Sequence, residues 1–454
     1  MSRTIAAIAT PAAVGGISVI RISGDEAFAV ADRVFSPVSG KSLSGMKGYT
    51  AAYGSICDGE EVLDEGVATV FRAPKSYTGE DVVEISCHGG LFVTRKVLRA
   101  VLENGASMAE AGEFTRRSFL NGKMTLTQAE AVIDLIGAGS EQSLRSARSA
   151  MRGDLYQKIS GITSRLLTVS GHLSAYIDYP EEDIDGMEGD ELLRDCVDCL
   201  GELDRLLAGF DKGRIIREGV ETVIVGRPNV GKSTLMNLLA GCQKSIVTDI
   251  PGTTRDVVEE TVNLGDVILR LADTAGIRET DNPVEKMGVD MALDRIGTAG
   301  LILAVFDSSE PVSDDDRELA ARLKGMPAVA VLNKSDLANK FDKEFISNNF
   351  IHIVEISARE NRGIKELNRE ITDLLALTDL SGAGAILQNE RQRDCTLRAR
   401  KLLAEVCDTI RAGYTLDAVD VALESALSSL MELSGERVSE AVVQQVFSHF
   451  CVGK

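Results

Sequence analysis

The chain has 454 residues, more than one hydrophobic core usually organises, so about two to four domains are expected. Hydrophobic residues make up 44% of the sequence and aromatic residues only 4%, which predicts a core built mainly from aliphatic side chains. The formal net charge of −20 argues against a protein that coats nucleic acid through many phosphate contacts, although it is compatible with a local basic patch or an RNA-handling partner.

The sequence contains no run of about 18 apolar residues, the length that a membrane-spanning helix needs. Residues 1–13 lack the layout of a signal peptide, because their apolar run is short and Pro11 interrupts it. We therefore expect a cytoplasmic protein with no membrane span, whose eight cysteines are reduced. Cys196 and Cys199 form a lone C-x-x-C pair on the apolar side of a helical pattern, which favours core packing over a redox or metal role.

Residues 1–118 combine short strand-like runs, glycine-rich turns and a helical pattern at 93–102, and predict an α+β domain. Residues 119–217 show helical periodicity. Thr127 and Glu130 fit a capping box at the start of one helix, and an apolar stripe from Leu144 to Ile177 predicts one long helix.

From 218 to 378 strand and helix patterns alternate, which predicts a mainly parallel sheet with helices on both faces. The predicted strands lie at 222–225, 267–272, 301–306, 328–332 and 352–356. Helical patterns return over 379–454. The predicted fold class is therefore multidomain, with an α+β N-terminal domain and an α/β domain inserted into an α-helical domain.

A P-loop pattern, G-x-x-x-x-G-K-[ST], spans residues 226–233 between a predicted strand and a predicted helix. Its glycines let backbone N–H groups approach phosphates at a helix N-terminus. Lys232 places a positive charge beside the β and γ phosphates, and Ser233 offers a hydroxyl to Mg²⁺. This motif by itself is compatible with either ATP or GTP.

Further motifs follow the other predicted strands and narrow the choice to GTP. Asp336, in Asn333-Lys-Ser-Asp336, can accept two hydrogen bonds from the N1–H and 2-amino groups of guanine, a donor pair that adenine lacks. Residues 273–276 (Asp-Thr-Ala-Gly) fit a water-mediated Mg²⁺ contact and a γ-phosphate sensor, and residues 357–359 can close over the base. Residues 252–256 occupy the position of the first switch, where Thr254 is the expected Mg²⁺-sensing hydroxyl.

The predicted GTP-binding residues come from the P-loop, the first switch, the 273–276 motif, the guanine motif and the last strand end. They are Asn229, Val230, Gly231, Lys232, Ser233, Thr234, Thr248, Asp249, Ile250, Pro251, Gly252, Thr253, Thr254, Asp273, Thr274, Ala275, Gly276, Asn333, Lys334, Asp336, Ser357, Ala358 and Arg359.

The sequence lacks the catalytic glutamine of Ras-like enzymes, because the position after the 273–276 motif is the apolar Ile277. Glu285 is a candidate for orienting the attacking water, with Glu279 and Asp281 as equal rivals on spacing alone. Transition-state charge on the phosphates needs a positive partner, either an arginine finger or a monovalent cation. Asn229 in the P-loop offers a side-chain carbonyl for such a cation.

The P-loop, the Gly-Thr-Thr-Arg-Asp switch and the segment Cys451-Val-Gly-Lys454 together resemble the MnmE (TrmE) family of tRNA-modification GTPases. The resemblance covers essentially the whole chain. The G-domain motifs are shared with relatives such as Era and EngA, so the N-terminal segments and the Cys-x-Gly-Lys segment are more specific. Val452 departs from the isoleucine expected there, which puts nothing in doubt.

The resemblance implies a potassium-dependent GTPase that is activated when its G domains dimerise. It implies that Asn229, Thr248, Ile250 and Thr253 bind K⁺ and that Glu285 orients water. It further implies a homodimer that works with the flavoprotein MnmG (GidA) in a heterotetramer. This complex would install a carboxymethylaminomethyl-type group on C5 of the wobble uridine, position 34, of certain tRNAs.

The one-carbon donor implied by the resemblance is 5,10-methylene- or 5-formyl-tetrahydrofolate, bound in the N-terminal domain that also mediates homodimerisation. The matching positions are Arg21, Glu84, Lys123 and Lys454. Cations suit the glutamate tail of a folate, and a carboxylate suits the donor edge of the pterin, although each residue alone is more often a surface charge. Cys451 is the reactive-looking thiol of the family motif, and its part in the modification chemistry stays open.

The main alternative is a GTP-switched ribosome-assembly factor. An Era-like protein would carry a basic RNA-binding module with a G-x-x-G loop after its G domain, and EngA would carry a second P-loop. The residues after 380 show helical patterns and neither feature. A membrane-remodelling GTPase would need an amphipathic membrane-binding segment, and the sequence has none.

Overall fold

The structure is a computed structural model that describes residues 3–178, 189–241, 260–271, 297, 299–377 and 385–454. These residues form two compact units. The first contains Met1–Ile133 and Met431–Lys454, and the second contains Asp134–Leu430. No helix among the described residues is long and apolar enough to cross a membrane.

The first unit is built on a seven-stranded sheet with the order β3-β4-β5-β6-β2-β1-β7. Its neighbouring strands are antiparallel except for the parallel pair β1–β7. The strands are β1 (Ile5–Ile8), β2 (Ile17–Ser23), β3 (Phe35–Pro37), β4 (Thr50–Asp58), β5 (Glu61–Phe71), β6 (Val82–His88) and β7 (Ser107–Met108). Side chains alternate between the faces of each strand, so β2 directs Ile20 and Ile22 into the core and Arg21 to the opposite face.

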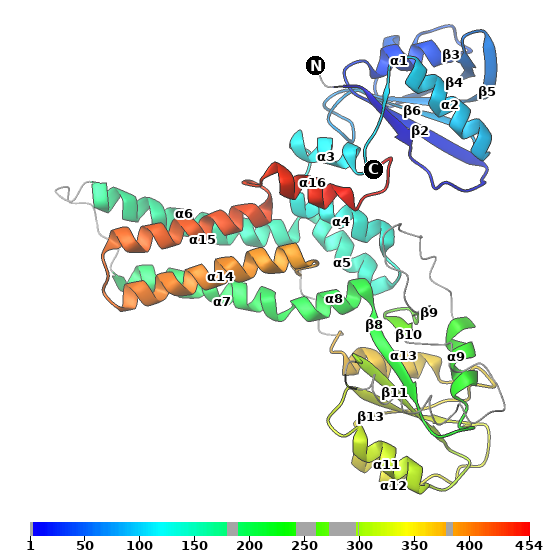
Figure 1. The fold of residues 1–454 in the computed structure, drawn as a ribbon, viewed down its shortest axis with the longest axis vertical. Helices are drawn as coiled ribbons and strands as arrows, with labels where there is room; N and C mark the ends of the chain where they lie inside the picture. The colour runs from blue at the N-terminus through cyan, green and yellow to red at the C-terminus, as the bar shows by residue number, and fades with distance from the viewer. Residues whose placement is uncertain (1–2, 179–188, 242–259, 272–296, 298, 378–384) are drawn as a thin grey trace. The chain divides into compact units, whose positions relative to one another are not determined.

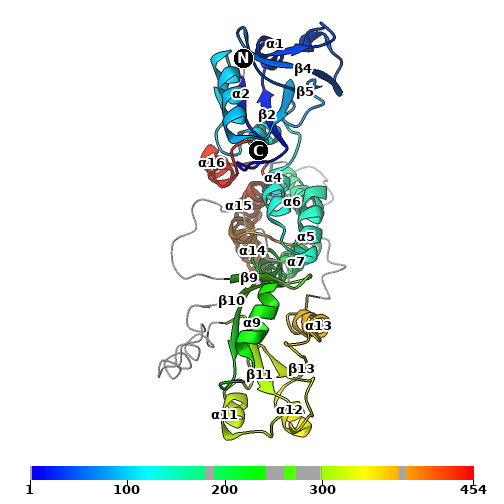
Figure 2. The same cartoon turned by 90° about the vertical axis from the view of Figure 1, so that its right-hand side faces the viewer.

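Helices α1 (Ala27–Val34) and α2 (Leu91–Glu103) cover one face of this sheet and bury a single hydrophobic core with it (Figures 1 and 2). Helices α3 (Glu113–Leu120) and α16 (Glu440–Ser448) pack against each other in the same unit. The chain end then returns to the sheet region, where Phe114 N–H donates to the Lys454 carbonyl at 3.2 Å. Gly453 has a φ of 105°, and a Cβ there would lie 2.2 Å from the Ile8 carbonyl oxygen, so this close approach requires glycine.

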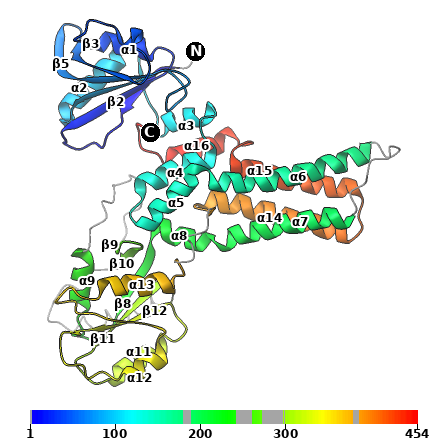
Figure 3. The same ribbon diagram turned by 180° about the vertical axis from the view of Figure 1, so that it is seen from behind.

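The second unit contains a helical part made from two separated stretches of chain. Its helices are α5 (Glu141–Arg152), α6 (Asp154–Asp178), α7 (Gly189–Ala208), α8 (Phe210–Glu218), α14 (Glu390–Arg411) and most of α15 (Leu416–Ser434). Helices α6, α7, α14 and α15 run side by side (Figures 1 and 3). The α/β segment is therefore inserted between two halves of one helical layer. Cys196 and Cys199 are buried within it, as expected for core packing.

Two local sequence predictions in this region were wrong. The apolar stripe from 144 to 177 is divided between α5 and α6, because Gly153 adopts a left-handed φ of 84° and ends α5. The capping box also lies two residues earlier than predicted, since α4 (Leu126–Gly137) begins at Leu126. Thr125 Oγ1 accepts from Gln128 N–H at 3.3 Å, and Gln128 Oε1 accepts from Thr125 N–H at 2.9 Å.

The inserted segment forms a six-stranded sheet with the order β13-β12-β11-β8-β10-β9. Among the pairs formed by the described strands of this segment, only β9–β10 is antiparallel. Its strands are β8 (Val220–Val225), β9 (Glu260–Asn263), β10 (Ile268–Leu271), β11 (Leu301–Asp307), β12 (Ala328–Asn333) and β13 (His352–Glu355). Helices α9 (Lys232–Gly241) and α13 (Ile364–Leu374) share one core, whereas α11 (Asp314–Arg322) and α12 (Lys343–Asn349) share the core on the other face. The predicted fold class is confirmed in all three parts.

Candidate functional site

The P-loop connects the end of β8 to the start of α9, so it lies at the carboxyl edge of a parallel sheet, where such folds bind ligands. Gly226 and Gly231 have φ angles of 154° and 96°, and both pack against neighbouring strands. A Cβ at Gly231 would lie 2.2 Å from the Asn333 amide nitrogen, and one at Gly226 would lie 2.4 Å from the Val305 carbonyl oxygen. Larger residues at these two positions would push the loop away from the sheet.

The Lys232 ammonium holds the beginning of the P-loop over the first turn of α9. Its Nζ donates to the carbonyl oxygens of Gly226 at 2.7 Å and Arg227 at 2.9 Å. The loop is anchored on its outer side by Arg227, which pairs with Glu310 at 2.6 Å and with the buried Asp316 at 3.5 Å. The loop therefore surrounds a positive charge beside a helix N-terminus, the arrangement that binds phosphate.

Asn333 joins three of the predicted nucleotide motifs and is only 2% exposed. Its Nδ2 donates to the Val230 carbonyl at 2.9 Å, and its Oδ1 accepts from Ala358 N–H at 3.0 Å. The P-loop, the end of β12 and the loop after β13 are consequently held together by one side chain. This residue organises the site rather than offering its own amide to a ligand.

The Asp336 carboxylate is oriented by Ser357, whose hydroxyl donates to Oδ1 at 2.7 Å. This hydrogen bond, with the positive charges of Arg359 and Arg362, holds the pKa of Asp336 below its usual range. Asp336 is thus an ionised acceptor at neutral pH, as recognition of guanine requires. Lys334 has a left-handed φ of 64° and pairs with Asp307, turning the chain sharply after β12.

Several predicted site residues lie outside the described residues. They are Thr248, Asp249, Ile250, Pro251, Gly252, Thr253, Thr254, Asp273, Thr274, Ala275, Gly276 and Glu285. Within the described part of the chain, no group of three or more His, Cys, Asp or Glu side chains could hold a metal ion. The residue predicted for Mg²⁺ within this part is Ser233, in the first turn of α9.

A second polar site lies in the first unit, on the sheet face opposite α1 and α2. Arg21 on β2 and Glu84 on β6 are register partners, and Arg21 Nε lies 2.8 Å from Glu84 Oε1. Arg21 also donates to the Gly453 carbonyl at 3.2 Å. Its guanidinium carbon lies 5.4 Å from the centre of the Tyr77 ring and 5.6 Å from that of Phe114, within cation–π range.

The chain end completes this second site. Burial holds the pKa of the Lys454 ammonium below its usual value, and the neighbouring Arg21 charge lowers this pKa further. The Glu84 and Cys451 side chains act in the opposite direction. Cys451 is exposed, and its carbonyl accepts from Gly112 N–H at 3.4 Å. The structure therefore brings Arg21, Glu84 and Lys454 together.

Lys123 has a different contact, because its Nζ donates to the Pro74 carbonyl at 2.9 Å. It supports the loop that carries Tyr77 rather than contacting the Arg21–Glu84 pair. Sequence reasoning did not single out Tyr77 or Phe114. An aromatic residue in a loop and another in a short helix carry no sequence signal that they flank the same arginine.

A P-loop and a guanine-type acceptor at the carboxyl edge of one parallel sheet define the class of protein, a P-loop GTPase. The family described as "MnmE helical domain" matches residues 126–451, and that described as "GTP-binding protein TrmE N-terminus" matches residues 4–123. The chain belongs to the MnmE (TrmE) family of GTPases.

Relatives named tRNA modification GTPase MnmE match almost end to end. The one from Thermoanaerobacter pseudethanolicus is 41% identical over 456 residues, and the one from Symbiobacterium thermophilum is 43% identical over 455 residues. Each alignment covers 99% of this chain and 99% of the relative. The solved G domain of the FeoB iron transporter from T. maritima is 27% identical over 34% of this chain and 98% of its own, with a TM-score of 0.26, and the family assignment does not rest on it.

Proposed function

We propose that this chain is a potassium-dependent, magnesium-requiring GTPase that acts in tRNA modification. With an MnmG-type flavoprotein it would convert C5 of the wobble uridine, position 34, to a carboxymethylaminomethyl-type group, using 5,10-methylene- or 5-formyl-tetrahydrofolate as the one-carbon donor. It would work as a cytoplasmic homodimer within a heterotetramer. The observation that carries the proposal is the pairing of Arg21 with Glu84 beside Lys454, in a chain that also has a guanine-type GTP site.

The proposal assigns one task to each part of the chain. Residues 1–118 would bind tetrahydrofolate and dimerise, 218–378 would bind and hydrolyse GTP, and 119–217 with 379–454 would form the helical domain. The sequence-predicted residues would serve the GTP site, with Ser233 and Thr254 for Mg²⁺. Among its described members, the oriented Asp336 carboxylate suits the role of base acceptor, and Asn333 holds the P-loop against the guanine motif.

The decisive test of the tRNA function is nucleoside analysis of tRNA from cells that lack this protein. Loss of the modified wobble uridine, restored by the parent gene and not by a Lys232→Ala gene, would support the proposal. Unchanged tRNA nucleosides together with accumulated ribosome precursors would favour the assembly-factor alternative.

Potassium should accelerate GTP hydrolysis by at least about tenfold over sodium at equal ionic strength, since a cation at the phosphates can take the place of an arginine finger. Asn229 is exposed within the P-loop and has a left-handed φ of 64°. Asn229→Ala should abolish the difference between the two salts, measured by phosphate release.

The control for this prediction is Asn229→Gly, which removes the amide but relieves the left-handed backbone. If the side-chain carbonyl binds the ion, both variants lose the potassium preference alike. A glycine variant that keeps the preference would show that backbone strain, and not the lost amide, explains the alanine result.

Arg21→Ala should weaken binding of 5-formyltetrahydrofolate by about ten- to a hundredfold, because it removes a charged donor and leaves the Glu84 carboxylate without its partner. Calorimetric titration of the full chain measures this. GTP hydrolysis should stay near the parent rate. Arg99→Ala is the control, since Arg99 makes an exposed pair with Glu103 on α2 and should leave folate binding unchanged.

A further inference from the structure

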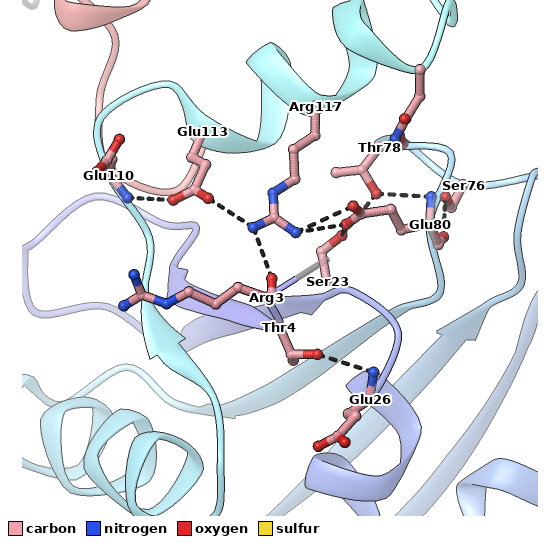
Figure 4. Close-up of polar contacts among 11 residues, drawn as sticks. Arg3, Thr4, Ser23, Glu26, Ser76, Thr78, Glu80, Glu110, Glu113 and Arg117 are labelled. Carbon is pink, nitrogen blue, oxygen red and sulfur yellow. Dashed lines mark hydrogen bonds and ion pairs between the residues drawn. The ribbon is translucent and has the colours of Figure 1, made fainter. Parts of the chain in front are cut away.

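A cluster of three charged and mostly buried side chains lies in the first unit (Figure 4). Arg117 on α3 is 12% exposed, and its partners Glu80 and Glu113 are 13% and 10% exposed. Arg117 Nη1 lies 3.2 and 3.0 Å from the two Glu80 oxygens, and Nη2 lies 2.7 Å from Glu113 Oε1. Nη2 also donates to the Arg3 carbonyl at 2.8 Å.

The carboxylates in this cluster have further donors, so the network extends over several segments. Glu80 Oε2 accepts from the Ser23 hydroxyl at 2.8 Å, at the end of β2. Glu113 Oε2 accepts from Glu110 N–H at 2.8 Å, in the turn before α3. The Arg117 guanidinium thus ties the 76–81 loop to α3, and Glu80 extends the network to the end of β2, as Figure 4 shows.

The two segments that Arg117 joins carry the two rings flanking Arg21. Tyr77 lies in the 76–81 loop, and Phe114 follows Glu113 in α3. The loop and the helix also meet directly, since the Tyr77 hydroxyl lies 2.9 Å from Thr115 Oγ1 and the Ser118 hydroxyl donates to the Tyr77 carbonyl at 2.7 Å. The position of each ring therefore depends on how the loop is held against the helix.

We propose that Arg117 is a positioning residue for ligand binding at the Arg21–Glu84 site. It acts through the 76–81 loop and α3, which place Tyr77 and Phe114 against the Arg21 guanidinium. This inference rests on the proposed function, in which the ligand is a tetrahydrofolate. Arg117 sets the position of the arginine that receives the anionic ligand, and it makes no ligand contact itself.

The geometry requires an arginine because the two carboxylates approach from different segments. A guanidinium presents several N–H groups in a rigid plane, so it binds both at once, whereas an ammonium is a point charge on a flexible stem. Arg117→Lys keeps the positive charge and the approximate volume. It should hold one carboxylate and release the other, which loosens the loop from α3 without leaving the cluster wholly unpaired.

The test is calorimetric titration of the full-length Arg117→Lys protein with 5-formyltetrahydrofolate, against Arg116→Lys as the matched control. Arg116 neighbours Arg117 on the same helix and pairs with the exposed Glu110 at 3.5 Å. Arg117→Lys should raise the dissociation constant about ten- to a hundredfold, the scale for weakening one hydrogen bond between charged groups in the site. Its melting temperature and GTP hydrolysis should match those of the Arg116→Lys protein.

A second readout separates positioning from general weakening of the fold. In the wobble-uridine reaction with the flavoprotein partner, Arg117→Lys should raise the KM for the tetrahydrofolate donor by the same factor, while kcat at saturation stays within about twofold of the parent. If Arg117→Lys does not fold, Glu80→Gln is the substitute, since it keeps the Arg117–Glu113 pair and should give a smaller rise in the same constant.

The outcomes are distinct. If the parent protein binds the folate and Arg117→Lys, or its substitute, binds it equally well, this inference is overturned and the proposed function stands. Equal losses in the Arg117→Lys and Arg116→Lys proteins would also overturn it, because the effect would then not depend on the buried cluster. A parent protein that does not bind the folate would overturn the folate part of the proposed function and this inference with it.

Discussion

Asp336→Asn is expected to lower GTP affinity by about 10²-fold or more and to raise affinity for xanthosine triphosphate. In the proposed site the carboxylate would accept two hydrogen bonds from the guanine edge, and the Ser357 hydroxyl keeps it oriented and ionised. An amide replaces one acceptor with a donor, which would face the 2-amino group of guanine. Xanthine has a carbonyl in place of the 2-amino group, so the new donor meets an acceptor.

The measurement is a nucleotide competition titration with GTP, xanthosine triphosphate and ATP on both proteins. Asp336→Asn alters only the contact with the base. Replacing Lys232 as well should therefore lower the affinity by the same factor in the parent and in the variant. A variant that binds GTP as tightly as the parent would show that Asp336 does not contact the base. The depressed pKa adds a condition: the carboxylate stays charged above its lowered pKa, so GTP selectivity should persist at mildly acid pH and fail only as the pH drops through that value.

Glu285→Ala is expected to slow GTP hydrolysis by about 10²- to 10⁴-fold, the usual contribution of a side chain that positions or deprotonates water. GTP affinity should change little, because orienting the attacking water matters mainly in the transition state. The apolar Ile277 follows the 273–276 motif, so another group has to orient the water. Single-turnover hydrolysis and a separate binding titration distinguish the two effects.

Glu279→Ala and Asp281→Ala are the matched controls, since both are carboxylates in the same segment and were equal candidates on spacing. They should hydrolyse GTP at close to the parent rate. If either control is as slow as Glu285→Ala, the assignment of the water-orienting role passes to that residue or to the segment as a whole.

The sequence alone predicted that the P-loop and the guanine motif each follow directly after a strand, and the described residues have this arrangement. The P-loop is a contiguous segment between β8 and α9, and the structure shows that Gly226 and Gly231 are needed for close packing. The guanine motif follows its strand directly, and parallel strands bring such ends to one edge. The α/β fold class of the inserted segment followed from the alternation of strand and helix patterns along the sequence.

Tertiary structure decided the features that depend on distant partners. Arg21 and Glu84 are 63 residues apart and meet only through the β2–β6 register, whereas Arg21 and Gly453 are 432 residues apart. Lys123 fitted the same motif-based set, yet its contact is with Pro74. The apolar periodicity of the sequence continues across Gly153, although α5 ends there. The spacing of apolar residues indicates which face of a helix is buried, but it carries no information on the φ angle of a single residue.

The charged cluster around Arg117 shows most clearly that contacts between distant residues are not readable from the sequence. In the sequence Arg116 and Arg117 are adjacent and chemically identical, and nothing in their spacing distinguishes them. The helix directs Arg117 toward two buried carboxylates and leaves Arg116 partly exposed beside Glu110. Successive side chains on a helix are about 100° apart, so burial of one neighbour and exposure of the other is settled only when α3 packs against the 76–81 loop.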